Sequence, residues 1–199
     1  GGLMYSSKSH RPTWAEINID VIRSNVKKIK EKCDPDIQII GIVKADAYGH
    51  GAVQISQELT RLGITYLGVA TLDEGIELRT NGITIPIIVF GPVEPNEFSK
   101  LMEFNIYPVV SNYNYAKELA ENYRYRGLFP KVHIEIDTGM GRLGVPFDNA
   151  LLAGVIVQRL VMNSNFEIKL FVQQGSETLS SLCDRVRKWN PTLFISLHQ

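Results

Sequence analysis

Short apolar runs recur along the chain and alternate with segments of helical pattern. Three of them, residues 39–43 (IIGIV), 64–71 (ITYLGVAT) and 85–90 (IPIIVF), are rich in β-branched residues. Such runs predict strands that are buried on both faces. Helices are expected between them, at residues 52–62 and 72–81. Strands and helices that alternate in this way form βαβ units around a parallel sheet with right-handed crossovers.

The alternation continues toward the end of the chain. The further expected elements are a helix at 96–104, a strand at 107–110, a helix at 114–125, a strand at 132–136, a strand at 166–171, a helix at 179–189 and a strand at 193–197. At the start, residues 11–20 predict a short strand, and Asp20 is expected to be the N-cap of the helix that follows it. No G-x-G-x-x-G motif follows the first buried strand. A (β/α) barrel therefore fits at least as well as a doubly wound sheet.

Composition limits the classes of partner. The 199 residues suffice for one domain with a real core, and 21 Lys plus Arg balance 21 Asp plus Glu, which gives no reason to expect nucleic acid or an anionic membrane. The sequence has no signal peptide and no apolar run long enough to span a bilayer, and Cys33 and Cys183 show no metal-ligand spacing. We therefore expect a cytoplasmic protein with reduced thiols, no metal and no membrane partner. Residues 1–10 are expected to be disordered, with Gly1–Leu3 as a cloning remnant.

A lysine stands at the carboxyl end of the first buried run. Lys44 follows residues 39–43 directly, and an unpaired ammonium is costly to bury. Desolvation favours the uncharged amine, which is the form that makes a Schiff base. Tyr48 follows four residues later, and Gly49 and Gly51 let a ligand approach the backbone closely. The alternative is a lysine that only extends its ammonium from a strand end into water.

A second candidate motif is DTGMGRLG at residues 137–144. Its three glycines permit tight turns and a close approach of the backbone to a ligand. The guanidinium of Arg142 could bind a carboxylate through two parallel hydrogen bonds. The alternative is a glycine-rich surface turn that carries a solvated arginine.

Both motifs resemble signatures of one enzyme family. KADAYGHG at residues 44–51 closely resembles the pyridoxal-phosphate lysine motif of alanine racemases, and DTGMGRLG is similar to their second signature. RPTWAEI at residues 11–17 also resembles the opening of these enzymes. The resemblance covers about residues 11–144 and implies a (β/α)8 TIM-type barrel that binds pyridoxal 5'-phosphate. It further implies a cytoplasmic homodimer that interconverts L- and D-alanine, the latter a precursor of peptidoglycan.

The resemblance also implies roles for individual residues. Lys44 would carry the cofactor as a lysine aldimine and act as one of two catalytic bases. Tyr48 would lie beside the cofactor, and Arg142 would contact both the substrate carboxylate and the cofactor. Asp137 and Met140 match the second motif and are expected to be structural neighbours of the site.

One position departs from the family pattern. Many racemases have a lysine, often carbamylated, two residues before the aspartate of the second motif, and its negative charge orients the arginine. This chain has Glu135 there. A carboxylate supplies the same charge without modification, which makes Glu135 the expected partner of Arg142. The alternative is a glutamate that points outward at a strand end.

The resemblance fades after about Gly144, and residues 150–199 diverge from the family. VQQGSETLSS at 172–181 stands where a histidine-bearing segment is expected, and His198 belongs to no recognisable motif. The last barrel strand is not found, nor is the C-terminal β domain with the tyrosine that serves as second base. We therefore expect residues 11–199 to form an incomplete barrel domain in a truncated chain that racemises poorly alone.

Three functions are consistent with the sequence. The first is a pyridoxal-phosphate-dependent racemase, or its barrel portion, with alanine as the substrate and serine as the alternative. The second is a single-domain protein that binds or carries pyridoxal phosphate, like the small barrel proteins related to racemases. The third is a non-catalytic fragment that associates because an incomplete barrel exposes apolar strand edges.

Overall fold

A computed structural model describes residues 15–35, 37–128, 130–137, 141–146, 167–173 and 194–196. Its helices are α1 (Ile19–Lys32), α2 (Lys44–Gly49), α3 (Ala52–Arg61), α4 (Leu72–Thr80), the 3-10 turn η1 (Pro95–Glu97), α5 (Phe98–Glu103) and α6 (Tyr113–Tyr125). Its strands are β1 (Gln38–Ile42), β2 (Tyr66–Val69), β3 (Ile87–Val89), β4 (Ile106–Val110), β5 (Lys131–Asp137), β6 (Val145–Pro146), β7 (Glu167–Gln173) and β8 (Phe194–Ser196). The order confirms the predicted alternation of strands and helices.

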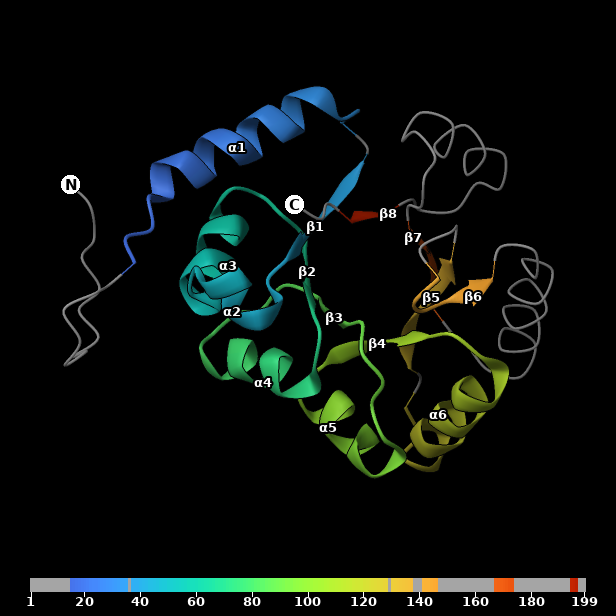
Figure 1. Cartoon of the computed structure of the whole chain (residues 1–199). Coiled ribbons are helices and arrows are strands. Elements are labelled where there is room, and N and C mark those ends of the chain that lie inside the picture. Colours follow the sequence, from blue (N-terminus) through green and yellow to red (C-terminus); the bar gives the residue numbers. More distant parts are fainter. Residues whose placement is uncertain are drawn as a thin grey trace.

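The strands form a closed ring in which all pairs are parallel. The ring runs β1-β2-β3-β4-β5-β7-β8, and β8 pairs back with β1. The short strand β6 adds to the carboxyl end of β5. Figure 1 shows α2 to α6 outside the strands. Within the described part of the chain, the fold is thus the expected α/β barrel, with seven strands in the ring in place of eight.

The pairs that close the ring differ in extent. Gln38 of β1 lies opposite Phe194 of β8, and Val109 of β4 lies opposite His133 of β5. Each of the seven described ring strands therefore has a partner on both sides. Between β7 and β8, however, only Phe171 and Phe194 pair, so the seven-stranded ring agrees with the expected incomplete barrel.

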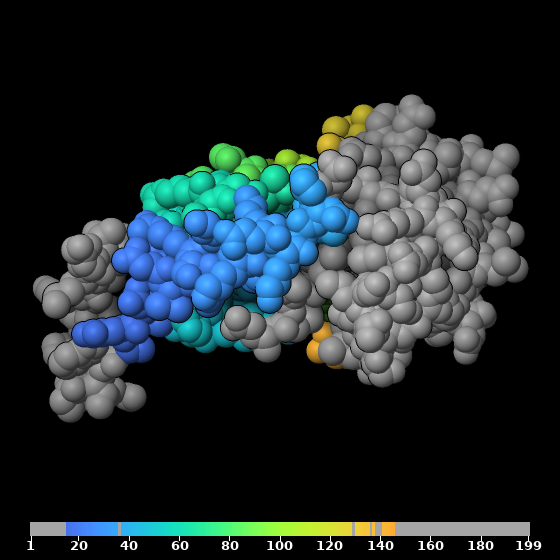
Figure 2. Space-filling model, turned by 90° about the horizontal axis from the view of Figure 1, so that it is seen from above, coloured from blue at the N-terminus to red at the C-terminus, as the bar shows by residue number. Residues whose placement is uncertain are grey.

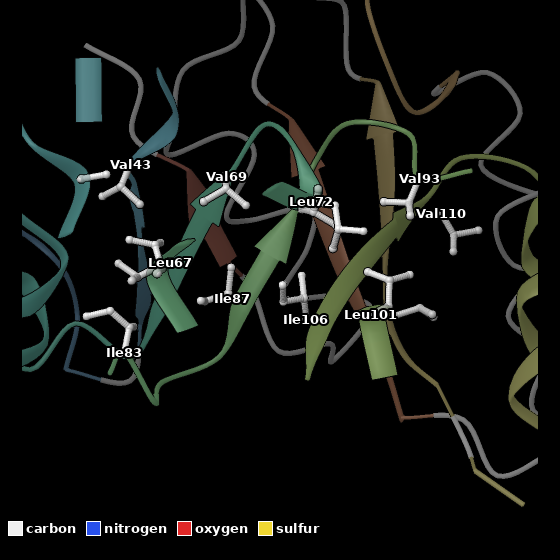
Figure 3. Packing of buried hydrophobic residues seen from close by; sticks show 14 of the residues in the cluster. Val43, Leu67, Val69, Leu72, Ile83, Ile87, Val93, Leu101, Ile106 and Val110 are labelled. Carbon is white, nitrogen blue, oxygen red and sulfur yellow. The ribbon is translucent and has the colours of Figure 1, made fainter. Parts of the chain in front are cut away.

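Alternate residues of strands β1 to β5 face opposite sides of the sheet, and both sides are largely buried. The residues that face the helices form the larger core, as Figure 3 shows for Leu67, Ile87 and Ile106. The residues that face the barrel axis form a second, smaller cluster: Ile40, Tyr66, Ile88 and Val109. Burial on both sides explains why β2 and β3 are apolar throughout.

The start of the chain differs from the prediction. Residues 15–18 form no strand, residues 11–14 lie outside the described part, and α1 begins at Ile19. Asn18, not Asp20, is the N-cap: its side chain accepts hydrogen bonds from the Asp20 and Val21 amides. Asparagine caps a helix as well as aspartate does, and Asp20 instead lies in the first turn, where its charge suits the helix dipole.

The other predicted elements are present with shifted ends. The strand predicted at 64–71 is the shorter β2, and the helix predicted at 72–81 is α4 with Asn81 as its C-cap. The expected helix at 179–189 lies outside the described residues. No helix in the described ranges is long and apolar enough to cross a membrane.

Arg79 joins α4 to the amino ends of two neighbouring strands. Its Nε and Nη2 donate to the carbonyls of Phe104 and Asn105, each at 2.8 Å. Its Nη1 donates to the carbonyls of Ile83 and Ile85, each at 2.7 Å. One guanidinium therefore satisfies four backbone acceptors in the loops that lead into β3 and β4.

We expect Arg79→Met to lower the free energy of unfolding by about 2–3 kcal/mol, because hydrogen bonds from a charged donor are lost and carbonyls are left unpaired. Urea unfolding measures the change. Arg124→Met, at an exposed position near the end of α6, is the control and should change stability little. Equal losses in the two variants would contradict the role of Arg79.

Glu58 joins α3 to α1, which lies across one outer face of the molecule (blue in Figure 2). Glu58 is 4% exposed, and its carboxylate accepts hydrogen bonds from Arg23 Nε at 2.7 Å and Arg61 Nη1 at 3.3 Å. The hydrogen bond from Arg23 is the main cause that holds the pKa of Glu58 below its ordinary value of 4.5, against the opposing effect of burial. The ionised carboxylate therefore stabilises the fold.

This lowered pKa predicts a pH dependence of stability. The contribution of Glu58 is complete above its ordinary pKa of 4.5 and is lost as the pH falls through the lower pKa of the folded state. Glu58→Gln should thus be less stable than the parent protein at neutral pH, and the difference should shrink in acid. Urea midpoints between about pH 7 and about pH 3 test this. The exposed Glu121→Gln is the control, and a difference that does not change with pH would refute the prediction.

Candidate functional site

Lys44 lies at the carboxyl end of β1, at the rim of the barrel. The last residue before it, Val43, is 1% exposed, and its amide donates to the Gly68 carbonyl of β2 at 2.9 Å. Lys44 itself is half-buried and opens α2. The structure thus places Lys44 at the strand-to-helix junction that the sequence indicates, at the end of a barrel where active sites lie.

The segment after Lys44 is a left-handed turn. Ala45, Asp46, Ala47 and Tyr48 have φ of 50°, 55°, 51° and 56°, with ψ between 38° and 52°. For residues other than glycine this conformation costs roughly 1–2 kcal/mol each. The sequence predicts positive φ only at glycines, as is found at Gly49 with φ of 80°. The four preceding residues carry no such signal, apart from an aspartate that tolerates this region.

Hydrogen bonds within the segment hold the left-handed turn (residues 45–48). The Ala47 amide donates to the Val43 carbonyl at 3.0 Å, and the Gly51 amide donates to the Asp46 carbonyl at 2.9 Å. The Asp46 side chain accepts from the Ala52 amide at 2.7 Å. Ala52 is the first residue of α3, so the Asp46 carboxylate also places a negative charge at a helix N-terminus, where it is favourable.

His50 closes the carboxyl end of the turn. Its Nδ1 lies 2.9 Å from the Ala47 carbonyl oxygen and 3.1 Å from that of Tyr48. Both neighbours are acceptors, so Nδ1 must carry the proton and donate to them. His50 therefore has a structural role at this site, which the sequence analysis did not assign.

The turn brings two of the predicted site residues together. Lys44 Nζ lies over the Tyr48 ring, 5.8 Å from its centroid, and Tyr48 is 48% exposed. An ammonium at this distance is attracted to the face of an aromatic ring. The pair therefore presents an amine and a phenol side by side at the barrel rim.

Glu74 is a residue of the site that the sequence analysis missed. It lies in the first turn of α4, where Thr71 and Glu74 form a capping box. Its carboxylate also accepts from the Ala45 amide, next to Lys44, at 2.7 Å. The spacing T-x-x-E before an apolar run was the signal for the capping box. Nothing in the sequence indicates the contact with Ala45.

Arg142 lies beyond the carboxyl end of β5 and is exposed. Because β1 and β5 belong to one parallel ring, Lys44 and Arg142 lie at the same end of the barrel. The Asp137 carboxylate accepts from the Gly141 amide at 2.9 Å, which holds the start of this loop. Met140 lies outside the described residues.

Glu135 is buried inside the barrel, with 3% of its surface exposed. Burial raises the pKa of Glu135, the charge of Arg142 lowers it, and Asp137 raises it again. A Cβ on Gly144, which has φ of 105°, would lie 3.0 Å from Glu135 Cγ and 2.9 Å from the Asp137 amide. The loop that carries Arg142 thus folds back tightly on β5. The alternative in which Glu135 points outward is wrong.

The described residues contain no group of three or more His, Cys, Asp or Glu that could hold a metal ion. The site's polar groups are an amine, a phenol, a guanidinium and carboxyl groups, of which that of Glu135 is buried. This donor set suits an organic ligand with an aldehyde and an anionic group.

Comparisons with known proteins agree with this geometry. Residues 17–173 match the family model described as alanine racemase, N-terminal domain. Alanine racemase of Clostridium kluyveri is 44% identical over 141 residues, which are 71% of this chain and 36% of that protein. Alanine racemase of Clostridium novyi is 44% identical over 163 residues, which are 81% of this chain and 41% of that protein.

A solved structure is similar over nearly the whole chain. Alanine racemase of Clostridium difficile 630 superimposes with a TM-score of 0.79 at 31% sequence identity, over 95% of this chain and 53% of that one. The chain thus spans about half of that structure and a smaller share of the curated relatives. On the family model, the identities and the fold together, the chain belongs to the alanine racemase family and matches its N-terminal barrel domain.

Proposed function

We propose that this chain is the cofactor-binding barrel of a pyridoxal-phosphate-dependent alanine racemase, and that Lys44 is the residue that carries the cofactor. The observation that supports this most is the position of Lys44. Lys44 is half-buried at the barrel rim, its amine lies over the ring of Tyr48, and the backbone that follows it is held in a costly conformation. Strain of this kind is found where a fold must direct a functional side chain.

The residues present fit the cofactor. Its aldehyde requires a primary amine, which Lys44 supplies, and Tyr48 beside that amine offers an aromatic ring and a hydroxyl to the cofactor. When bound, pyridoxal phosphate acts as an electron sink that makes the proton on the α-carbon of an amino acid removable. Lys44 Nζ would take or return that proton on one face of the substrate.

Arg142 would bind the carboxylate of the amino acid. A guanidinium and a carboxylate match in shape and charge. The buried Glu135 interacts with the charge of Arg142, which opposes the rise that burial causes in the pKa of Glu135. Alanine is the proposed substrate, with serine as the alternative.

Transfer of a proton on the opposite face requires a second group. Tyr48 lies in the same short helical segment as Lys44 and its ring contacts the lysine amine, so we assign it to the same side of the site as Lys44. We propose that a residue of a second subunit provides the other base, in a cytoplasmic homodimer.

A protein that binds pyridoxal phosphate without racemising is the second candidate. The contact of Lys44 with Tyr48 supports it, because both residues proposed to meet the cofactor lie within this chain. Both candidates require Lys44, and they differ in whether D-alanine is formed.

The test is the binding of pyridoxal phosphate to the 199-residue chain, followed by borohydride reduction and peptide mass spectrometry. We expect a single reduced adduct on Lys44, and no adduct in Lys44→Ala. Lys117→Ala, at an exposed position on α6, is the control and should behave like the parent protein. Adducts spread evenly over surface lysines would refute the proposal. If the adduct forms on Lys44, an assay for D-alanine separates the racemase from the binding protein.

A further inference from the structure

Glu74 lies between the carboxyl ends of two barrel strands. Its Oε1 accepts from the Ala45 amide at 2.7 Å, and its Oε2 accepts from the Ala70 amide at 2.7 Å and the Thr71 amide at 3.2 Å. Ala45 lies just beyond β1, and Ala70 directly follows β2. One half-buried carboxylate thus joins the left-handed turn to the neighbouring strand.

From this geometry we propose that Glu74 is a positioning residue that holds the left-handed turn and thereby directs the Lys44 side chain. The expected effect of Glu74 on cofactor binding rests on the proposed function. The expected effect of Glu74 on the backbone of the turn does not depend on that function.

Helix capping alone does not account for these contacts. A capping box requires Glu74 to accept from the N-cap residue, Thr71, which is the longest of its three contacts. The two shorter contacts go to amides outside α4. An ionised acceptor makes hydrogen bonds about twice as strong as a neutral one, so the charge of Glu74 acts mainly on the strand ends.

The left-handed turn needs support from outside itself. Its other hydrogen bonds described above all come from residues 43–52, which move together if the segment changes conformation. Glu74 belongs to a different helix and is held by β2. Its contact with Ala45 therefore resists relaxation of the turn toward the right-handed conformation that L-residues prefer.

The contact acts directly on Lys44 through the peptide bond. The amide of Ala45 and the carbonyl of Lys44 belong to one planar unit. A hydrogen bond that fixes this plane limits rotation about the ψ bond of Lys44, which sets the direction of its side chain. Without Glu74, Lys44 Nζ would lose its fixed position over the Tyr48 ring.

Glu74→Ala and Glu74→Gln test the proposal, with Thr71→Val as the matched control. Thr71→Val removes the hydroxyl that accepts from the Glu74 amide at 3.3 Å and so weakens the capping box. It leaves intact the hydrogen bond from the Ala45 amide to the Glu74 carboxylate. Two quantities are measured: hydrogen exchange of the Ala45 amide by NMR, and the rate at which pyridoxal phosphate forms a borohydride-stable adduct on Lys44.

In Glu74→Ala we expect exchange at Ala45 to become about tenfold faster, relative to global unfolding, and adduct formation about tenfold slower. Glu74→Gln should show smaller changes in the same direction, because its uncharged amide has one acceptor oxygen for donors on two sides. If Glu74→Ala does not fold, Glu74→Gln takes its place in both measurements. Thr71→Val should lower the urea midpoint and leave both quantities unchanged.

Equal changes in Thr71→Val and the Glu74 variants would overturn the proposal and leave Glu74 as a cap only. Unchanged exchange at Ala45 in both Glu74 variants would overturn it as well. If the parent protein forms no adduct on Lys44, the proposed function fails, and the exchange measurement still decides the role of Glu74.

Discussion

Strands β1 to β5 of this barrel are buried on both faces over most of their length, and this constraint limits where chemistry can occur. A residue inside β1 faces either the helices or the barrel axis, where Ile39 and Ile40 are almost fully buried. A charged amine cannot be placed at such a position without a large cost. The first position at which the chain can carry one is the rim, and Lys44 stands there. The site is thus a consequence of how the core is packed.

The left-handed turn shows how the rim is made rigid. Four L-residues in this conformation oppose folding by several kcal/mol in total, at roughly 1–2 kcal/mol each. Asp46, His50 and Glu74 offset this cost with hydrogen bonds from side chains to backbone groups. The result is a lysine whose backbone is fixed before any ligand arrives, so little ordering is left to oppose binding.

The sequence predicted the strands well and the backbone of the site poorly, for physical reasons. Apolar runs report burial directly, and β1, β2 and β3 follow from them. The motif at residues 44–51 placed Lys44 and Tyr48 in one loop, and the family pattern together with charge placed Glu135 near Arg142. The conformation of Ala45 depends on a contact with Glu74, which is distant in the chain. Local sequence patterns cannot predict a contact between residues so far apart in the chain.

The closed ring also has a kinetic consequence. β1, near the start of the chain, completes its hydrogen bonding with β8, near its end, where Ile39 lies opposite Ile195. Pairing between segments so far apart must overcome the largest loss of chain entropy in the fold. During synthesis, β1 to β4 can assemble as each βαβ unit leaves the ribosome, but one edge of β1 has to wait for the last strand. The segment that carries Lys44 therefore begins to form early and is completed last.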